Sequence, residues 1–163
     1  MAGPGGQPRP SFDTYALELA GTASIRGSCA RRQQGAVLVR GQRILAAGYD
    51  GGPPGAPRCD EGGCPASALT AGETDQARCI GVHAIARVLL DAGAEQLDGA
   101  SVYATTAPCL SCATLLATAG VAEVVAAGGR YDGWSAVREL LLTCGVRVRV
   151  LDGLEGVPRL ALG

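Results

Sequence analysis

Apolar residues recur along most of this chain with the spacing of helices or of strands. Near the N-terminus, Ser11 precedes apolar residues at a helical spacing: Phe12, Tyr15, Ala16, Leu19 and Ala23. A serine directly before such a run can cap a helix, so we predict that a helix begins there. Two apolar runs follow at residues 36–40 and 43–49, separated by a Gly41-Gln42 turn. They predict a hairpin of two buried strands.

From residue 80 onward, helical and strand patterns alternate regularly. The pattern predicts helices over residues 82–92 and 109–119 and from Trp134 to Cys144, with Gly145 ending the last one. Cys144 falls on the apolar face of that helix, which predicts a core position. Strands are predicted over residues 101–105, 121–127 and 146–151. The order α-β-β-α-β-α-β-α-β predicts an α/β fold with three layers, α/β/α, around a five-stranded mixed sheet.

Residues 50–79 form a long stretch without either pattern. Its first part, residues 50–57, is dense in glycine and proline, which predicts a loop. A loop of this length in a compact domain usually has a specific reason. Three cysteines lie in it, Cys59, Cys64 and Cys79. A bound metal ion would supply that reason.

Composition and charge narrow the class of protein. Apolar residues make up 47% of the chain, which is typical of a globular domain. We expect one domain over residues 11–152, with a flexible tail at residues 1–10 and a second tail at 153–163. No apolar run reaches the about 20 residues of a membrane helix, and the first ten residues do not resemble a signal peptide. We therefore expect a cytoplasmic protein that does not contact a membrane and keeps its seven cysteines reduced or metal-bound.

The charges give little support for nucleic-acid binding. The formal net charge is −1, so no general attraction to polyanions is expected, and we predict no nucleic-acid partner. The chain has no lysine, and all its basic side chains except one histidine are arginines. An arginine is therefore weak evidence for phosphate recognition in this sequence.

The residues with metal-binding chemistry have a distinctive spacing. Cys109 and Cys112 follow a predicted strand and open a predicted helix, so their thiols lie one turn apart on one face. His83, the single histidine, opens the preceding helix. Zinc binds four ligands in a tetrahedron. Three protein ligands with a fourth position left for water predict a catalytic rather than a structural zinc site.

These motifs resemble the zinc-dependent cytidine and deoxycytidylate deaminases, whose signature is H-x-E followed by P-C-x-x-C. The matching segments here are His83-Ala84-Ile85 and Pro108-Cys109-Leu110-Ser111-Cys112. Three further segments are similar to those of bacterial and phage deoxycytidylate deaminases: residues 35–39, the G-Y-D-G at 48–51 and the T-A-G-V at 118–121. The resemblance extends from about Phe12 to Leu151. It implies a cytidine-deaminase-like fold and the hydrolytic deamination of a cytosine nucleotide.

The resemblance also implies further site residues and partners. Four cysteines occupy places where relatives hold a second, structural zinc: Cys29, Cys59, Cys64 and Cys79. We therefore predict two zinc ions per chain. Asp50 replaces an asparagine that contacts substrate in the family, and other candidate substrate contacts are Arg26, Arg31 and Tyr131. The expected partners are a cytosine nucleotide or a related base and, as a dimer or hexamer, further copies of the chain.

Ile85 stands where the family has its catalytic glutamate. That glutamate is the general acid/base, and such catalysis contributes about 10²–10⁴-fold. We therefore predict weak or absent turnover, and restoration of turnover by Ile85→Glu. Asp50 could replace part of the lost acid/base capacity. Two other interpretations stay open: a non-catalytic zinc-binding partner subunit, and a deaminase scaffold used for other chemistry in secondary metabolism.

Overall fold

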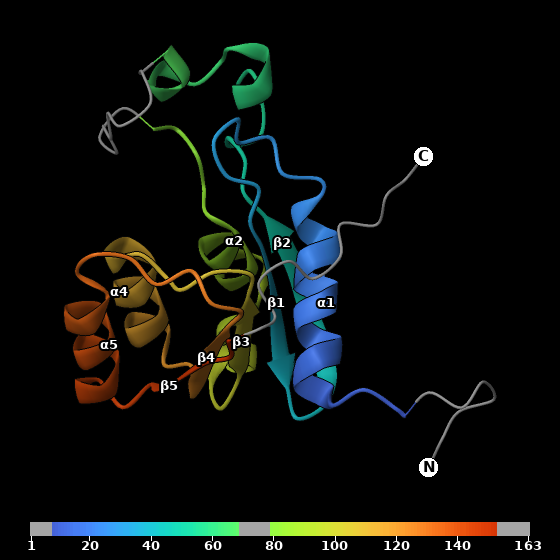
Figure 1. Cartoon of the computed structure of the whole chain (residues 1–163), viewed down its shortest axis with the longest axis vertical. Coiled ribbons are helices and arrows are strands. Elements are labelled where there is room, and N and C mark those ends of the chain that lie inside the picture. Colours follow the sequence, from blue (N-terminus) through green and yellow to red (C-terminus); the bar gives the residue numbers. More distant parts are fainter. Residues whose placement is uncertain (1–7, 69–78, 153–163) are drawn as a thin grey trace.

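The structure, a computed structural model of the whole chain, describes residues 8–68 and 79–152. Figure 1 shows them as a layered α/β arrangement. The predicted tails lie outside the described residues over 1–7 and 153–163, and so does the part of the long loop over 69–78. Residues 8–10 are exposed. No helix of the described ranges is long and apolar enough to cross a membrane.

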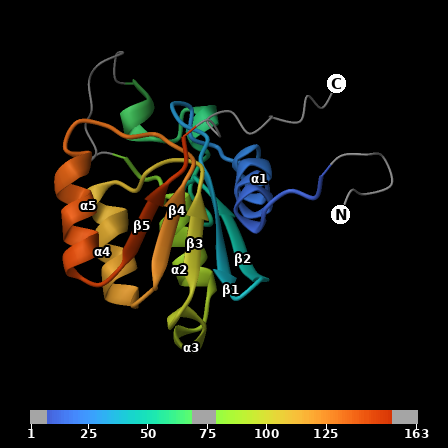
Figure 2. The same cartoon turned by 60° about the horizontal axis from the view of Figure 1, so that its bottom comes forward.

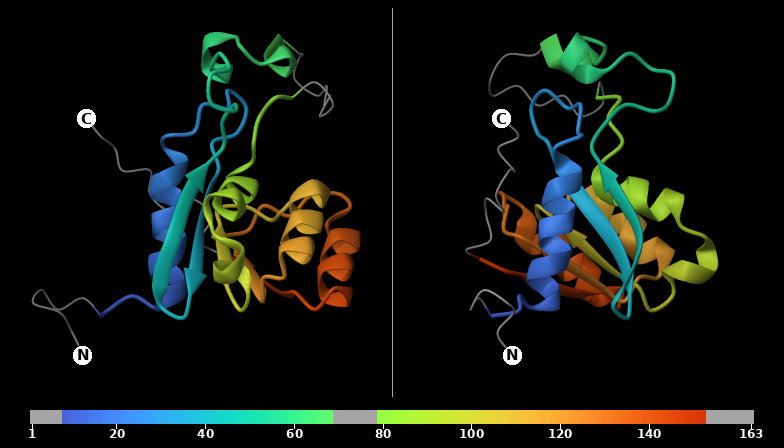
Figure 3. Two further views of the ribbon diagram at one scale, coloured as in Figure 1. Left: turned by 180° about the vertical axis from the view of Figure 1, so that it is seen from behind. Right: turned by 90° about the vertical axis from the view of Figure 1, so that its right-hand side faces the viewer.

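Five α-helices and five strands make up the described fold. The helices are α1 (Phe12–Ser24), α2 (Ala84–Asp91), α3 (Ala94–Leu97), α4 (Leu110–Ala119) and α5 (Trp134–Thr143). The strands are β1 (Gly35–Arg40), β2 (Arg43–Tyr49), β3 (Ser101–Ala104), β4 (Glu123–Ala126) and β5 (Arg147–Val150). Two short 3₁₀ helices, η1 (Cys59–Glu61) and η2 (Pro65–Ala68), lie in the long loop. Figure 3 shows them beyond one end of the sheet, away from the packed layers.

The strands form one mixed sheet in the order β2-β1-β3-β4-β5. β1 pairs antiparallel with both β2 and β3, whereas β3, β4 and β5 are parallel. α1 covers one face of the sheet, and α2, α4 and α5 cover the other, as Figures 1 and 2 show. The predicted three-layer α/β/α fold with a five-stranded mixed sheet is confirmed.

Alternation along the strands divides the core into two parts. In β3, Val102 and Ala104 pack toward α2, α4 and α5, whereas Tyr103 packs toward α1. The part beneath α1 is smaller. α1 approaches the sheet closely at Gly35, where an added Cβ would lie 1.9 Å from the carbonyl oxygen of Ala20. Only a glycine fits at this start of β1.

Most element predictions are confirmed, with differences that follow from tertiary position. Ser11 caps α1 by accepting a hydrogen bond from the Thr14 N–H at 3.1 Å, as predicted. The buried face of α1 is centred on Ala16, Leu17 and Ala20, so the predicted place of Tyr15 on that face is wrong. β2 is not a buried strand, because it lies at the edge of the sheet.

The end of α5 also differs from the prediction. Trp134, Val137 and Leu141 are buried, but Cys144 is exposed, so its predicted core position is wrong. The reason is that α5 ends at Thr143, and Cys144 already belongs to the turn that leads into β5. Gly145 follows with a φ of 80°, which confirms its role in ending the helix.

Candidate metal centre and pocket

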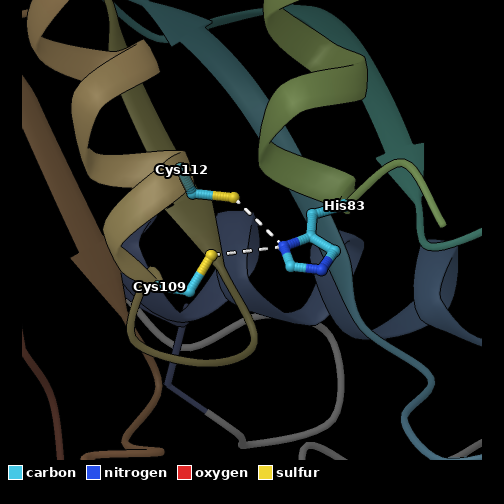
Figure 4. Close-up of side chains that lie close together, drawn as sticks. All are labelled: His83, Cys109 and Cys112. Carbon is cyan, nitrogen blue, oxygen red and sulfur yellow. Dashed lines mark hydrogen bonds between the residues drawn. The ribbon is translucent and has the colours of Figure 1, made fainter. Parts of the chain in front are cut away.

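Two helices on the same face of the sheet begin beside each other, and each follows a residue that can bind metal. His83 is the N-cap of α2, and Cys109 is the N-cap of α4. Cys112 stands in the first turn of α4. Figure 4 shows the side chains of Cys109 and Cys112 pointing from α4 toward the imidazole of His83 at the start of α2. The predicted arrangement of two zinc-bearing helices with adjacent N-termini is therefore present.

The distances among the three side chains suit one metal ion. His83 Nδ1 lies 3.4 Å from Cys109 Sγ and 3.4 Å from Cys112 Sγ. All three ligand atoms lie within 4.8 Å of one another. Tetrahedral zinc with bonds of about 2.3 Å to sulfur and 2.0–2.1 Å to nitrogen separates such atoms by about 3.5 Å. The donor types and their spacing fit zinc with one position left for a non-protein ligand.

The three groups also perturb one another electrostatically. A hydrogen bond from Cys112 lowers the pKa of Cys109 to about 4, against the opposing effect of burial and with a further contribution from His83. The pKa of Cys112 is raised, because it holds the proton that Cys109 accepts. The hydrogen bond to Cys109 raises the pKa of His83. A cation that displaced these shared protons would meet thiolate and imidazole lone pairs already directed at one point.

A pocket of about 250 Å³ opens beside this cluster. It is lined by Cys79, Gly81, Val82, His83, Ala86, Ser111, Cys112 and Leu115. Ser111 and Leu115 were not predicted as site residues. Ser111 lies inside the C-x-x-C motif and Leu115 one turn after it, so the helical spacing of α4 was the available signal. No carboxylate is among these described lining residues.

Ile85 does not line this pocket. It is 5% exposed and belongs to the same buried cluster as Val88, Leu38 and the ligand Cys112. Ala86, one residue later, is the α2 side chain that lines the pocket. Two residues after His83, the helix therefore places a buried apolar side chain in the cluster that also includes the ligand Cys112.

Asp50 lies next to the metal centre, although it does not line the pocket. It is 5% exposed, and its Oδ1 accepts a hydrogen bond from the Ala84 N–H at 2.6 Å. Burial raises the pKa of Asp50 to about 6, while the Ala84 N–H and the charge of His83 oppose the rise. Arg32 is near enough to affect Asp50 and His83 electrostatically. Arg32 directly follows Arg31 in the sequence, and no local pattern indicated which of the two arginines would affect Asp50 and His83.

The other predicted substrate contacts are not among the residues that line the pocket. Arg26 is exposed, and its Nε donates a hydrogen bond to the Tyr49 hydroxyl at 3.2 Å. Arg31 is exposed on the loop between α1 and β1. Tyr131 donates a hydrogen bond from its hydroxyl to the Pro108 carbonyl at 2.9 Å, directly before Cys109. Burial and the two nearby thiols raise the pKa of Tyr131, which places it close to the metal centre.

The cysteines of the predicted second site interact with one another, but among the described residues only His83, Cys109 and Cys112 have their ligand atoms all within 4.8 Å of one another. Cys59 and Cys79 both exchange hydrogen bonds with Cys64, and Cys29 is close enough to raise the pKa of each electrostatically, beyond the larger effect of burial. Backbone donors also face these sulfurs: Ala30 N–H points to Cys59 Sγ at 3.5 Å and Gly81 N–H to Cys79 Sγ at 3.4 Å. Burial raises the pKa of Cys64, but the N–H groups of Ile80 and Ala66 and the two neighbouring thiols lower it overall. Such N–H groups stabilise thiolates.

Comparison with known proteins agrees with this geometry. Residues 10–128 match the family model of the cytidine and deoxycytidylate deaminase zinc-binding region. Over 144 residues the chain is 42% identical to a deoxycytidylate deaminase of Schizosaccharomyces pombe, covering 86% of this chain and 44% of that protein. It is 40% identical over 123 residues to the deoxycytidylate deaminase of Mycobacterium phage D29, covering 72% of this chain and 94% of the phage protein.

The chain spans about half the length of the yeast proteins that it matches, the second being a deoxycytidylate deaminase of Saccharomyces cerevisiae. Among solved structures, the dCMP deaminase of cyanophage S-TIM5 in complex with dCMP and dUMP is similar, with a TM-score of 0.71 and 27% identity. That match covers 89% of this chain and 100% of the phage chain. RibD of Acinetobacter baumannii, at 24% identity and a TM-score of 0.63, shares the fold.

Proposed function

Because this chain belongs to the cytidine and deoxycytidylate deaminase family, we propose that its reaction is the hydrolytic deamination of a cytosine nucleotide, of the type that converts deoxycytidylate to deoxyuridylate. The main support is the convergence of His83, Cys109 and Cys112 beside a pocket. Zinc held by these three residues would supply an activated water for attack on C4 of the base.

The pocket supports a base as the part of the substrate that enters. Its volume of about 250 Å³ is below the range of about 300–1,000 Å³ that is typical of pockets for drug-sized ligands. The sugar and phosphate would then remain outside the pocket, and the exposed side chains of Arg26 and Arg31 are the candidates to contact them. The S-TIM5 relative, which binds dCMP and dUMP, supports the same class of ligand. We propose deoxycytidylate as the first substrate to test.

We further propose that turnover by this chain is weak. Proton transfer to the ring and to the leaving amine needs a side chain that can carry protons, and the residues that line the pocket include no carboxylate. Ile85, in the place of the family glutamate, lies in the core. The loss of about 10²–10⁴-fold corresponds to roughly 3–5 kcal/mol of activation free energy. The same feature favours a second candidate, a zinc-binding partner subunit without turnover of its own.

The proposal also includes a second zinc ion. Cys29, Cys59, Cys64 and Cys79 would hold it as a closed four-thiolate site, supported by the backbone N–H groups that face their sulfurs. The 3₁₀ helices η1 and η2 of the long loop lie beyond the packed layers, and among the described residues of that loop only Cys64 and Ala66 are buried hydrophobic side chains. Cys79 also lines the pocket. A zinc ion at this second site would therefore fix one wall of the pocket as well as the loop.

Ammonia release tests the proposed reaction directly. The panel should contain deoxycytidylate, cytidylate, deoxycytidine and guanine, each with the zinc-loaded chain and with Ile85→Glu and Ala86→Glu. We expect slow or undetectable release from the unaltered chain. Ile85→Glu should raise the rate about 10²-fold or more, because position 85 is where the family has its general acid/base glutamate. Ala86→Glu tests whether a carboxylate at a neighbouring position that lines the pocket can do the same.

Ile85→Gln is the matched control, because glutamine has a similar shape to glutamate but no acid. Equal rates for Ile85→Gln and Ile85→Glu would contradict a missing general acid/base. Rapid deamination by the unaltered chain, abolished by Asp50→Asn in a form that keeps its zinc, would instead assign the proton transfer to Asp50. Zinc retention without activity toward any nucleotide, in every variant, would favour the partner-subunit function.

A further inference from the structure

The first turn of α2 needs hydrogen-bond acceptors that its own N-cap does not provide. The first N–H groups of a helix have no partner within the helix, and an Asp, Asn, Ser or Thr at the N-cap usually accepts from one of them. The N-cap of α2 is His83, whose side chain makes no capping hydrogen bond. Its Nδ1 faces Cys109 and Cys112 instead. A metal ligand therefore occupies the position where a capping residue normally stands.

Two acceptors from other parts of the chain replace the missing cap. Asp50 Oδ1 accepts from the Ala84 N–H at 2.6 Å, across 34 residues of sequence. The Ala86 N–H points to the sulfur of Cys112. A carboxylate at a helix N-terminus is stabilised both by hydrogen bonding and by the helix dipole. The start of α2 is thus held by one carboxylate and one metal-binding thiol.

The backbone around Asp50 is itself fixed, so its carboxylate has little freedom to move. The Asp50 N–H donates to the Gln34 carbonyl, and the Asp50 carbonyl accepts from the Ser28 N–H, both at 3.0 Å. In turn, the side chain of Arg87 in α2 donates hydrogen bonds to three backbone carbonyls, those of Tyr49, Gly51 and Gly52. Residues 49–52 and the first turn of α2 therefore hold each other from both sides.

Close packing brings the end of β2 to this position. A Cβ on Gly48 would lie 3.0 Å from Val88 Cγ1 and 3.2 Å from the Ala84 carbonyl oxygen. Gly51 and Val82 also exchange backbone hydrogen bonds just before the helix. Because the end of β2 packs this closely against α2, Asp50 is buried directly beside the N-terminus of α2.

We propose that Asp50 is a positioning residue for the metal ligand His83: its carboxylate caps α2 in place of His83 and so leaves the imidazole free to bind zinc. The inference rests on the zinc site of the proposed function but not on its substrate. Without the cap, the first turn of α2 would leave the Ala84 N–H buried and unpaired. His83 would then lose its fixed orientation, and the Ala86 N–H its alignment with Cys112.

Zinc affinity tests this role without any measurement of turnover. Affinity should be measured by competition with a chromophoric chelator for the whole chain, Asp50→Ala and Asp50→Asn. Asp50→Ala should weaken binding at the His83 site about 10–100-fold, the usual effect of losing a group that orients a ligand. Asp50→Asn keeps an acceptor oxygen and should stay within about threefold of the unaltered chain. Asp13→Ala, which removes partly buried hydrogen bonds on the other face of the sheet, is the control and should leave zinc affinity unchanged.

Cobalt separates positioning from ligation. Co²⁺ bound to thiolates gives a sulfur-to-metal absorption band that depends on the ligand set. Asp50→Ala should show the same band as the unaltered chain, reached at about 10–100-fold higher Co²⁺ concentration. A changed band would mean that Asp50 is itself a ligand, and would overturn the inference. So would equal affinities of Asp50→Ala and the unaltered chain, or an Asp50→Asn variant as weak as Asp50→Ala.

Ala84→Pro provides a second test if Asp50→Ala does not fold. Proline is tolerated at the first position of a helix, and it lacks the N–H from which Asp50 accepts a hydrogen bond. His83 already has the extended backbone, φ −69° and ψ 150°, that a residue before proline prefers. Ala84→Pro should therefore weaken zinc binding about as much as Asp50→Ala. Unchanged affinity in a folded Ala84→Pro chain would contradict the inference.

Discussion

Two clusters of polar side chains lie on opposite faces of the same sheet, and they are built differently. On the α2 and α4 side, His83, Cys109 and Cys112 converge on one point. On the α1 side, Asp13 accepts hydrogen bonds from Tyr103 at 2.8 Å and from Arg149 at 2.6 Å and 3.0 Å. Arg149 also donates to Glu123 at 2.9 Å. We call this second group the Arg149 network.

The difference lies in whether each cluster satisfies itself. In the Arg149 network a cation lies between two carboxylates, and a phenol donates to one of them, so donors and acceptors match. In the His-Cys-Cys cluster three ligand atoms with lone pairs point at one another and share protons. A cluster of the first kind stabilises the fold by itself. A cluster of the second kind needs an ion to complete it.

Metal content should separate the two faces most strongly. Protein purified without added metal should contain close to two equivalents of zinc. Cys112→Ser should remove one of them, and the double change Cys59→Ser with Cys64→Ser should remove the other. Metal bound at 1,000 times its dissociation constant stabilises the folded state by about 4 kcal/mol, so each loss should also lower the melting temperature. Elemental analysis and calorimetry measure both effects.

Two controls keep this result specific. Cys144 is exposed and lies far in sequence from the cysteines of both proposed zinc sites. Cys144→Ser should therefore leave two equivalents of zinc. Arg149→Met should also leave two. A content of one equivalent, unaffected by the Cys59 and Cys64 changes, would contradict the second zinc.

Removal of Arg149 should give the next largest effect, and on stability alone. Arg149→Met leaves Asp13 and Glu123 without their shared cation and should cost about 1–2 kcal/mol of unfolding free energy, since its 40% exposure allows solvent to screen the charges. Urea denaturation measures this cost. Arg147→Met is the matched control: that side chain is 70% exposed, contacts Glu123 at 3.8 Å, and should cost less than about 0.5 kcal/mol. Equal costs for the two variants would contradict the network.

The smallest effect should be a pH dependence from Asp13. The hydrogen bond from Arg149 lowers the pKa of Asp13 below its ordinary value of 3.8, although burial opposes the shift and Tyr103 supports it. The unfolded chain therefore binds this proton more readily than the folded one. The stabilisation is complete above the unfolded value and is lost as the pH falls through the folded pKa. The difference in unfolding free energy between the unaltered chain and Asp13→Asn should be under about 1 kcal/mol from this source and should shrink from pH 6 to pH 3. A gap that stays constant over that range would contradict it.

Local patterns in the sequence determined the elements and the identity of the metal ligands. Ser11 marks the start of α1 and Gly145 the end of α5, because capping depends on residues that are adjacent in the chain. The C-x-x-C spacing places Cys109 and Cys112 on one helical turn for the same reason. The order of helices and strands along the chain was sufficient to predict the layers of the fold.

Only the tertiary structure decided which side of each element faces the core, the pocket or solvent. Ile85 and Ala86 are neighbours in sequence, yet one packs in the core and the other lines the pocket, because the orientation of α2 on the sheet sets the difference. The exposure of Cys144 depends on where α5 stops against β5. Asp50 meets the Ala84 N–H only because the end of β2 packs against the start of α2. A contact across 34 residues leaves no periodic trace in the sequence, so long-range packing determined it.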